Sequence, residues 1–214
     1  MNPASPLIVE FGIVIGAYVL GSIPFGLALA RLFGGTDVRK EGSGNIGATN
    51  VARVVGPLAG ILTLLLDAGK GAAAVYAAER LTNSSAIWMV AAGFAALIGH
   101  CFPLWLDFKG GKGVATAAGV FSVLCPPAAL GALILFILVV WFWRYVSLGS
   151  ISAAAAMPLL IYLFWAPRHA PPLSVTIGTF AVAILIVYKH DGNIQRLVEG
   201  VEPKFGSGKK KDEE

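Results

Sequence analysis

PAALGALILFILVVWFW, residues 127–143, carries no charged side chain and decides the fold of this chain. A helix of this length is about 25 Å long, close to the ~30 Å hydrocarbon core of a bilayer. Similar runs lie near residues 7–30, 54–79, 86–103, 113–125, 148–166 and 172–188, which predicts seven membrane segments. The run at 113–125 is well short of the ~20 residues that a full crossing needs, so we expect a short or re-entrant fourth helix there.

The composition is typical of a protein embedded in a bilayer. Hydrophobic residues make up 57% of the 214 residues, charged residues make up 13%, and the mean hydropathy is +0.76. These values lie well outside the range of soluble domains. Because apolar runs cover nearly the whole chain, we expect one all-α integral membrane domain over residues 1–205. A disordered polar tail is expected at residues 206–214.

Two local patterns concern how the membrane helices run and pack. Pro24 removes a helical hydrogen bond within the first segment, which predicts a bend or a widening there. Gly12 with Gly16, and Gly56 with Gly60, have the four-residue spacing that lets helices approach closely in lipid. We expect these two glycine pairs to be packing sites.

Lys and Arg are unevenly distributed between the two sides of these segments. Of the 16 such residues, thirteen lie on one side, Arg80 and Arg168 lie on the other, and Lys70 lies inside a segment. Basic residues stay preferentially on the cytoplasmic side. We therefore expect the N-terminus outside and the C-terminus in the cytoplasm.

Two glycine-rich loops interrupt the apolar sequence on the predicted cytoplasmic side. The first glycine loop is GSGNIGATN at residues 42–50, and the second glycine loop is KGGKG at residues 109–113. Glycine exposes backbone N–H groups in concave turns that suit anions, and the start of a helix favours negative charge. The two loops therefore predict two phosphate sites, although a plain turn with a helix cap would use the same residue types. The residues expected to line the first site are Ser43, Asn45, Thr49, Asn50 and Arg53.

Neither loop fits a nucleotide-binding motif. The first loop matches GxGxxG, and Asp67 follows its last glycine by twenty residues. A dinucleotide-binding turn, however, follows a β-strand and opens a βαβ unit, whereas this loop follows a charged loop and Asp67 lies in an apolar run. The second loop has no Ser or Thr directly after Lys112, which argues against a Walker A site. A lysine between glycines can still bind one phosphate.

Asp67 and Lys70 are three residues apart within an apolar run. An uncompensated charge inside a membrane costs several kcal/mol, so the two should pair or face a polar cavity. A structural ion pair and a place in a substrate channel both remain open. The channel would suit a membrane transporter for a phosphorylated or anionic solute, although the chain has no internal repeat of the kind common in transporters.

Other catalytic centres find little support in the sequence. There is no CxxC, no HExxH and no cluster of carboxylates at ligand spacing, so we expect no metal, no cofactor and no nucleic acid partner. His100 and His190 lie at the predicted cytoplasmic ends of membrane segments. Five residues after them come Trp105 and Gln195, so the common acyltransferase dyad of His and Asp is absent.

Five stretches, in this order, resemble the PlsY family of bacterial acyl-phosphate:glycerol-3-phosphate acyltransferases. They are GSIPFG at 21–26, the first glycine loop, residues 99–113, RYVSLGS at 144–150 and residues 190–202. The resemblance implies transfer of a fatty acyl group from acyl phosphate to the 1-hydroxyl of glycerol 3-phosphate, giving lysophosphatidic acid and phosphate. This is the first acylation step of bacterial phospholipid synthesis. The resemblance also implies a multi-pass protein of the bacterial inner membrane with its active site facing the cytoplasm.

The resemblance implies a site built from several of these stretches. Catalytic roles would fall on Ser43, Asn45, Arg53, Lys112, His190 and Asn193. Substrate-binding roles would fall on Gly44, Gly47, Thr49, Asn50, Gly110, Gly111, Gly113 and Ser150. Acyl phosphate has a good leaving group, so alignment and charge stabilisation can suffice, and in the family's mechanism a phosphate oxygen of the substrate accepts the hydroxyl proton. Besides the lipid bilayer, a soluble enzyme that makes acyl phosphate would be a partner.

Overall fold

The computed structural model describes residues 7–165 and 170–206, and these ranges fold into helices. The helices are α1 (Leu7–Gly21), α2 (Phe25–Gly34), α3 (Ala48–Val54), α4 (Pro57–Leu81), α5 (Ala86–Cys101), the 3-10 turn η1 (Leu104–Leu106), α6 (Val114–Leu124), α7 (Pro126–Trp143), α8 (Val146–Trp165), α9 (Leu173–Lys189) and α10 (Asp191–Val198). The described residues contain no strand, which confirms the all-α prediction. Of the tail expected at 206–214, residues 207–214 lie outside the described residues.

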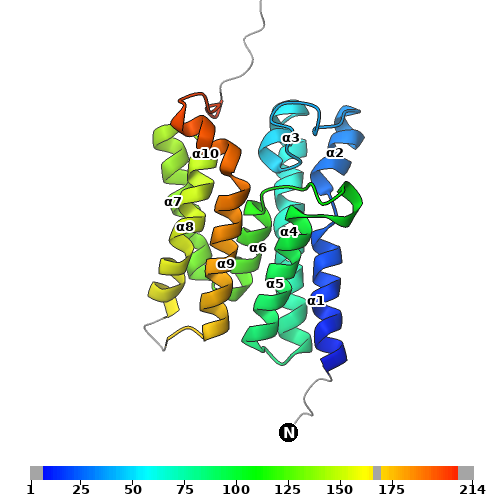
Figure 1. Ribbon diagram of the computed structural model, residues 1–214, viewed down its shortest axis with the longest axis vertical. Coiled ribbons are helices and arrows are strands. Elements are labelled where there is room, and N and C mark those ends of the chain that lie inside the picture. Colours follow the sequence, from blue (N-terminus) through cyan, green and yellow to red (C-terminus); the bar gives the residue numbers. More distant parts are fainter. Residues whose placement is uncertain (1–6, 166–169, 207–214) are drawn as a thin grey trace, which may run out of the picture.

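The long helices pack side by side as a bundle with roughly parallel axes (Figure 1). α1, α4 and α5 form one part of the bundle, α7, α8 and α9 form the other, and α6 lies between them. The short helices α2, α3 and α10 lie at the end opposite to the start of α1. Both glycine loops lead into helices on this side of the bundle, as their predicted common location requires.

Five helical stretches are long and apolar enough to cross a membrane. They are Leu7–Gly34, Pro57–Leu81, Ala86–Leu106, Pro126–Trp143 and Val146–Trp165. α9 and α10, which meet at 58°, would together make a sixth. α6, with 11 residues, is the short helix expected at the fourth segment. The protein is therefore a multi-pass membrane protein, while seven crossings and the orientation of the termini stay predictions.

The outer surface of α7 explains why the bundle needs lipid around it. Only 17% of the α7 window is buried, yet its mean hydropathy is 2.1. Leu133, Ile137 and Trp141, at four-residue intervals on one face, are 50–75% exposed. A continuous apolar face of this kind would be unstable in water, whereas hydrocarbon solvates it well.

Pro24 interrupts the first membrane segment. α1 ends at Gly21 and α2 begins at Phe25, so residues 22–24 lie outside both helices. Because proline has no N–H group, it cannot continue the hydrogen-bond ladder of α1. The predicted disturbance is confirmed as a short break, and the carbonyl of Ile23 at this break accepts a hydrogen bond from Lys70 Nζ at 3.1 Å.

Close contact between α4 and α6 depends on glycine in both helices. A Cβ atom on Gly71 would lie 2.1 Å from the Thr116 carbonyl oxygen, and a Cβ on Gly119 would lie 1.8 Å from the Ala68 carbonyl oxygen. Small residues allow backbones to approach this closely in lipid. The fourth, short helix is thereby held against α4 along much of its length.

The glycine pairs predicted as packing sites behave differently. A Cβ on Gly12, Gly16 or Gly56 would meet no atom within 4 Å, so the prediction is wrong for these three positions. A Cβ on Gly60 would lie 2.4 Å from Ala52 Cβ, which joins α4 to α3. The spacing alone does not tell which face of a helix meets a neighbour.

Asp67 and Lys70 form an ion pair, which is one of the two arrangements expected from the sequence. Lys70 Nζ lies 2.8 Å from Asp67 Oδ1, and the side chains are 1% and 3% exposed respectively. The two residues are buried in α4 rather than exposed to lipid. Burial of an unpaired charge here would be costly, so the pair is a structural requirement of this helix.

We expect Gly119→Ala to destabilise the bundle by about 1–3 kcal/mol, because the new methyl group would collide with a backbone carbonyl of α4. The thermal unfolding midpoint in detergent should fall by several degrees. Gly12→Ala is the matched control, because its methyl group would meet no atom within 4 Å. Equal midpoints for the two variants would show that the α4–α6 contact does not limit stability.

Candidate functional site

Asn50 holds the first glycine loop together. Its Nδ2 donates hydrogen bonds to three carbonyl oxygens, those of Val38 (3.0 Å), Glu41 (3.1 Å) and Asn45 (2.9 Å). Its Oδ1 accepts a hydrogen bond from the Ser43 N–H at 2.8 Å. The side chain is 2% exposed, and its two amide protons are shared among these three carbonyls of residues 38–45.

Several backbone amides of the first glycine loop are also used within this turn. The Gly44 N–H donates to the Glu41 carbonyl, and the Gly47 N–H donates to Asn45 Oδ1. Together with Ser43, these are amides that the sequence placed in an anion-binding nest. These three amides have hydrogen-bond partners in the turn itself, and their part in binding an anion stays a prediction. Gly44 adopts φ +71, which explains the glycine there as a requirement of the turn.

The second glycine loop closes the end of α5. The Gly111 N–H donates to the His100 carbonyl at 3.0 Å, and the Gly110 N–H donates to the Cys101 carbonyl at 3.1 Å. The last carbonyls of a helix have no partner inside the helix, so the loop supplies one. These two amides are used at the helix end, so their substrate-binding role stays a prediction, and Lys112 is the side chain of this loop that lines the polar hollow described below.

Gly113 ends the second glycine loop in a left-handed conformation, φ +84, and precedes the first residue of α6. A Cβ at this position would lie 2.4 Å from Leu97 Cδ1. Its role is thus also structural, because only glycine fits both the backbone conformation and the contact with α5.

The segment after α9 supplies the third part of the site. His190 is buried, and its Nδ1 lies 2.7 Å from the Ile186 carbonyl; since a carbonyl only accepts, Nδ1 carries the proton. Asn193, on the first turn of α10, accepts a hydrogen bond from Lys112 Nζ through Oδ1 and donates to Glu202 Oε1 through Nδ2 at 2.6 Å. The Lys112–Asn193 hydrogen bond joins the second glycine loop to α10.

These three segments surround a polar hollow of about 180 Å³. It is lined by Ser43, Gly44, Asn45, Lys112, Lys189, Gly192, Asn193 and Arg196. The lining residues come from both parts of the bundle, and the hollow lies at the end where α3 and α10 are drawn in Figure 1. Within the described residues that line it there are three cations and no carboxylate or histidine.

Burial and like charges lower the pKa of Lys112 to about 8. Burial is the largest cause; Arg196, Lys189 and Arg53 repel the ammonium as well, while Glu202 favours its charge. The hollow is therefore strongly electropositive. An anion bound there would relieve this repulsion, which is the electrostatic condition for binding phosphate.

Glu202 holds two side chains that line the hollow, those of Asn193 and Arg196. Its Oε2 accepts a hydrogen bond from Arg196 Nε at 2.7 Å, and its other oxygen accepts from Asn193. Burial raises the pKa of Glu202, but interactions with Ser147, Asn193 and Arg196 outweigh it and leave the pKa below its usual value. Glu202 is thus an ionised carboxylate that orients two lining side chains.

The residues predicted for the site fall into three groups. Those that line the hollow are Ser43, Gly44, Asn45, Lys112 and Asn193. Those that shape the surrounding loops are Gly47, Asn50, Gly110, Gly111 and Gly113. Those that do not line it are Thr49, Arg53, Ser150 and His190. Arg53 still repels the ammonium of Lys112, and Lys112 in turn helps to lower the pKa of His190.

Ser150 is the predicted residue least connected to the hollow. It is buried in α8, where its hydroxyl donates to the Val146 carbonyl at 2.9 Å. Serine one turn after the start of a helix commonly bonds back in this way. A substrate-binding role for Ser150 stays a prediction.

Sequence reasoning missed Lys189, Arg196 and Glu202 as members of the site. The two cations had been counted only as markers of the cytoplasmic side. A signal was present, because Arg196 follows Asn193 by three residues and so lies on the same face of a helix. Lys189 also donates to the Cys101 carbonyl at 3.3 Å, the same carbonyl that accepts from Gly110.

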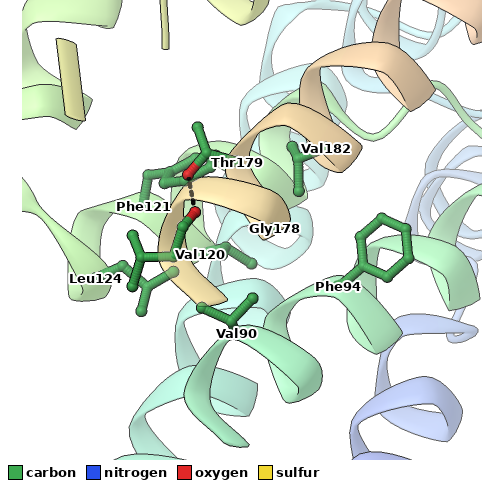
Figure 2. Close-up of a pocket in the computed structure, with 9 residues that line it drawn as sticks. Val90, Phe94, Val120, Phe121, Leu124, Gly178, Thr179 and Val182 are labelled. Atoms are coloured by element: carbon green, nitrogen blue, oxygen red, sulfur yellow. Dashed lines mark hydrogen bonds between the residues drawn. The ribbon is translucent and has the colours of Figure 1, made fainter. Parts of the chain in front are cut away.

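A second hollow, lined mostly by apolar side chains, lies between α5, α6 and α9 (Figure 2). Figure 2 shows Val90 of α5, Val120 and Leu124 of α6, and Gly178 of α9 around it. Its volume is about 10 Å³, roughly the space of one water molecule. It marks loose packing between these helices rather than a ready binding cavity.

Metal coordination has no visible basis in the described part of the chain. In residues 7–165 and 170–206, no group of three His, Cys, Asp or Glu side chains could hold an ion. The chemistry that the polar hollow itself can perform is binding and orienting anions through Lys, Arg, Asn and Ser donors.

Known proteins resemble this chain along nearly its whole length. The sequence profile of the family described as "Glycerol-3-phosphate acyltransferase" matches residues 11–200. A protein of that name from Syntrophotalea carbinolica is 52% identical over 192 residues, covering 90% of this chain and 95% of the relative. Another from Trichlorobacter lovleyi is 54% identical over 194 residues, with coverages of 90% and 95%.

The fold is also similar to crystal structures of PlsY (YgiH), described as an integral membrane glycerol 3-phosphate acyltransferase. Its glycerol 3-phosphate form superposes with a TM-score of 0.85 at 39% identity, covering 92% of this chain and 96% of that one. The lysophosphatidic acid form superposes with a TM-score of 0.83 at 38% identity, covering 92% of this chain and 96% of that one.

Asn50→Asp tests whether this side chain organises the first glycine loop. The variant keeps an acceptor for Ser43 but turns an oxygen toward three carbonyl groups, and each lost buried hydrogen bond costs about 1–3 kcal/mol. Amide hydrogen exchange in residues 38–50 should accelerate by a factor on the order of 10 to 100. Thr49→Ala, an exposed neighbour, is the control. Unchanged exchange in the Asp variant would contradict the assignment.

Proposed function

Because the chain belongs to the glycerol-3-phosphate acyltransferase family, it acylates glycerol 3-phosphate, and we propose that the acyl donor is a fatty acyl phosphate. The transfer would give 1-acylglycerol 3-phosphate, a lysophosphatidic acid, and inorganic phosphate. Among the solved relatives, PlsY (YgiH) is described in a glycerol 3-phosphate form and in a lysophosphatidic acid form.

The observation that carries the proposal is the composition of the polar hollow. Lys112, Lys189 and Arg196 face it, and Arg53 adds to its positive potential. This concentration of positive charge suits a pair of phosphorylated substrates better than a single one. It also favours phosphate as the leaving group, because charge develops on the phosphate as the anhydride bond breaks.

We assign roles by what each side chain can reach. Lys112, fixed by Asn193, binds a phosphate and stabilises the charge that develops on it. Ser43 and Asn45 lie across the hollow and can orient the glycerol hydroxyl or the acyl carbonyl. Asn50 acts indirectly by shaping the loop that carries both.

The hollow offers no protein base for the reaction. None of its described lining residues is a carboxylate or histidine, and Glu202 is already bonded to Asn193 and Arg196. We therefore propose that a phosphate oxygen of the substrate accepts the proton. The hydroxyl oxygen forms the new ester bond, the carbonyl–phosphate bond breaks, and the proton leaves on phosphate.

The acyl chain needs an apolar environment next to the polar hollow, and one face of α9 joins the two kinds of surroundings. Lys189 lines the polar hollow, and Val182, seven residues earlier, lines the apolar hollow. Seven residues return to the same helix face about 10 Å further along the axis. Val182 and Ile186 on this face are 5% and 3% exposed. We therefore propose that the helices packed against α9 separate as the acyl chain enters along this face.

Topology and partners complete the proposal. The uneven distribution of Lys and Arg supports a cytoplasmic location of the polar hollow in the bacterial inner membrane. Acyl phosphate is a reactive anhydride, so a soluble enzyme that makes it would act as a partner at this face.

The test is to offer the purified protein acyl phosphate and glycerol 3-phosphate without added metal. Phosphate release should match lysophosphatidic acid formation one for one. Lys112→Ala should reduce turnover by a factor on the order of 100 to 1,000 because it removes charge stabilisation of the phosphate. Lys109→Ala, an exposed neighbour that does not line the hollow, should retain activity.

Three results would contradict the proposal. Absence of product with acyl phosphate, but activity with another acyl donor, would overturn the donor. Wild-type turnover in folded Lys112→Ala would overturn the role of this lysine. Uptake of an anionic solute into liposomes without lipid product would favour transport.

The rate should also depend on the charge of Lys112. With a pKa of about 8, the ammonium is lost as the pH rises, so kcat/KM should fall tenfold per pH unit above roughly pH 8. The charged groups that act on it are Arg53, Lys189, Arg196 and Glu202.

Lys112→Arg is the matched variant, because its guanidinium stays charged above pH 12. Its kcat/KM should be lower but nearly independent of pH between 7 and 9.5. A wild-type profile that stays flat to pH 9.5 would contradict this assignment.

A further inference from the structure

Lys70 is the centre of a buried polar cluster that the proposed reaction does not use. Its Nζ lies 2.8 Å from Asp67 Oδ1, 2.9 Å from His100 Nδ1 and 3.1 Å from the Ile23 carbonyl oxygen. Asp67, Lys70 and His100 are all at most 5% exposed. The ammonium has three protons, and its three neighbours come from α4, α5 and the break between α1 and α2.

The contact with Lys70 fixes the orientation of the His100 ring. An ammonium only donates, so Nδ1 accepts and the proton of the neutral ring lies on Nε2. The other edge of the ring then faces the second glycine loop. A Cβ on Gly111 would lie 2.1 Å from Nε2 and 2.8 Å from Cε1, so the ring touches the backbone of this glycine.

His100 holds Gly111 from two directions. The ring packs against its Cα, and the His100 carbonyl accepts the Gly111 N–H at 3.0 Å. The next residue in the chain is Lys112, whose Nζ reaches Asn193 in the polar hollow. A displacement of Gly111 is therefore transmitted directly to Lys112.

We propose that the cluster of Asp67, Lys70 and His100 positions Lys112: Lys70 fixes the His100 ring, and the ring fixes Gly111 and hence the path of Lys112 into the hollow. The inference rests on the proposed function, because it requires Lys112 to bind phosphate. His100 does not line the hollow, so it is a positioning residue.

The informative variant is His100→Asn. Its Oδ1 can accept from Lys70 as Nδ1 does, which preserves the buried pair, but the side chain has no atoms in place of Nε2 and Cε1. Gly111→Ala makes the opposite change by adding a methyl group where the ring lies. The double variant removes the collision. Gly69→Ala is the control, since a Cβ there would meet no atom within 4 Å.

Each protein is compared by its thermal midpoint, kcat, KM and the pH dependence of kcat/KM. Gly111→Ala should lower kcat on the order of 100-fold, because a shift of about 1 Å in a positioning group has that effect. His100→Asn should lower kcat on the order of tenfold and shift the alkaline limb set by Lys112, at a midpoint near that of the wild type. The double variant should recover at least about tenfold over Gly111→Ala, which is the coupling expected of groups in contact.

A merely structural cluster would give different results. Folded His100→Asn with wild-type kcat and an unmoved alkaline limb would overturn the proposal. So would a double variant whose loss in kcat equals the product of the two single losses. If Gly111→Ala does not fold, the kcat and pH profile of His100→Asn decide alone.

Failure of the proposed function is recognised separately. Wild-type turnover in Lys112→Ala would remove the role of Lys112 on which the inference rests. Absence of lysophosphatidic acid formation by the wild-type protein would overturn the acyl phosphate donor only. In that case, calorimetric affinities for glycerol 3-phosphate in the same variants still test positioning, with Gly111→Ala weakened and the double variant restored.

Discussion

The polar end of the bundle depends on how the last carbonyl groups of α5 find hydrogen-bond partners. They have none within the helix, and the second glycine loop supplies them by bringing two amides to His100 and Cys101. This fixes the loop on the helix end, and Lys112 is its side chain that reaches the polar hollow. In the first glycine loop Asn50 fulfils the same requirement for three loop carbonyls. Because the fold uses these backbone donors, the proposed anion binding rests mainly on side chains.

Much of the fold could be predicted from the sequence, because hydrocarbon imposes a simple rule on composition. Apolar runs predict the helices, and the short fourth run predicts α6. Two charges inside a run indicate either a pair or a polar cavity, and the structure shows that Asp67 pairs with Lys70. It was harder to predict which face of a helix packs against a neighbour. Gly12 and Gly16 have the spacing of a packing site but meet nothing, since the spacing does not say which way a face points.

The sequence predicted where the site lies better than which groups of the chain line it. Glycines near Lys112 indicate an anion site, but whether their N–H groups face a ligand or a distant helix end depends on the tertiary fold. Lys189 and Arg196 were missed for a related reason, because cations on the predicted cytoplasmic side can serve both topology and binding. Only their approach to Lys112 distinguishes the two uses.

The face of α9 that carries Lys189 at one end and Val182 at the other has a consequence for turnover. If the reaction takes place where these two environments meet, its two products belong to different phases. Inorganic phosphate dissolves in water, whereas an acylated glycerol phosphate keeps its chain in the bilayer and can leave sideways between helices. Separation of the products would then oppose the reverse reaction, and the rate of lateral escape into lipid would become a property of α9 and its neighbours.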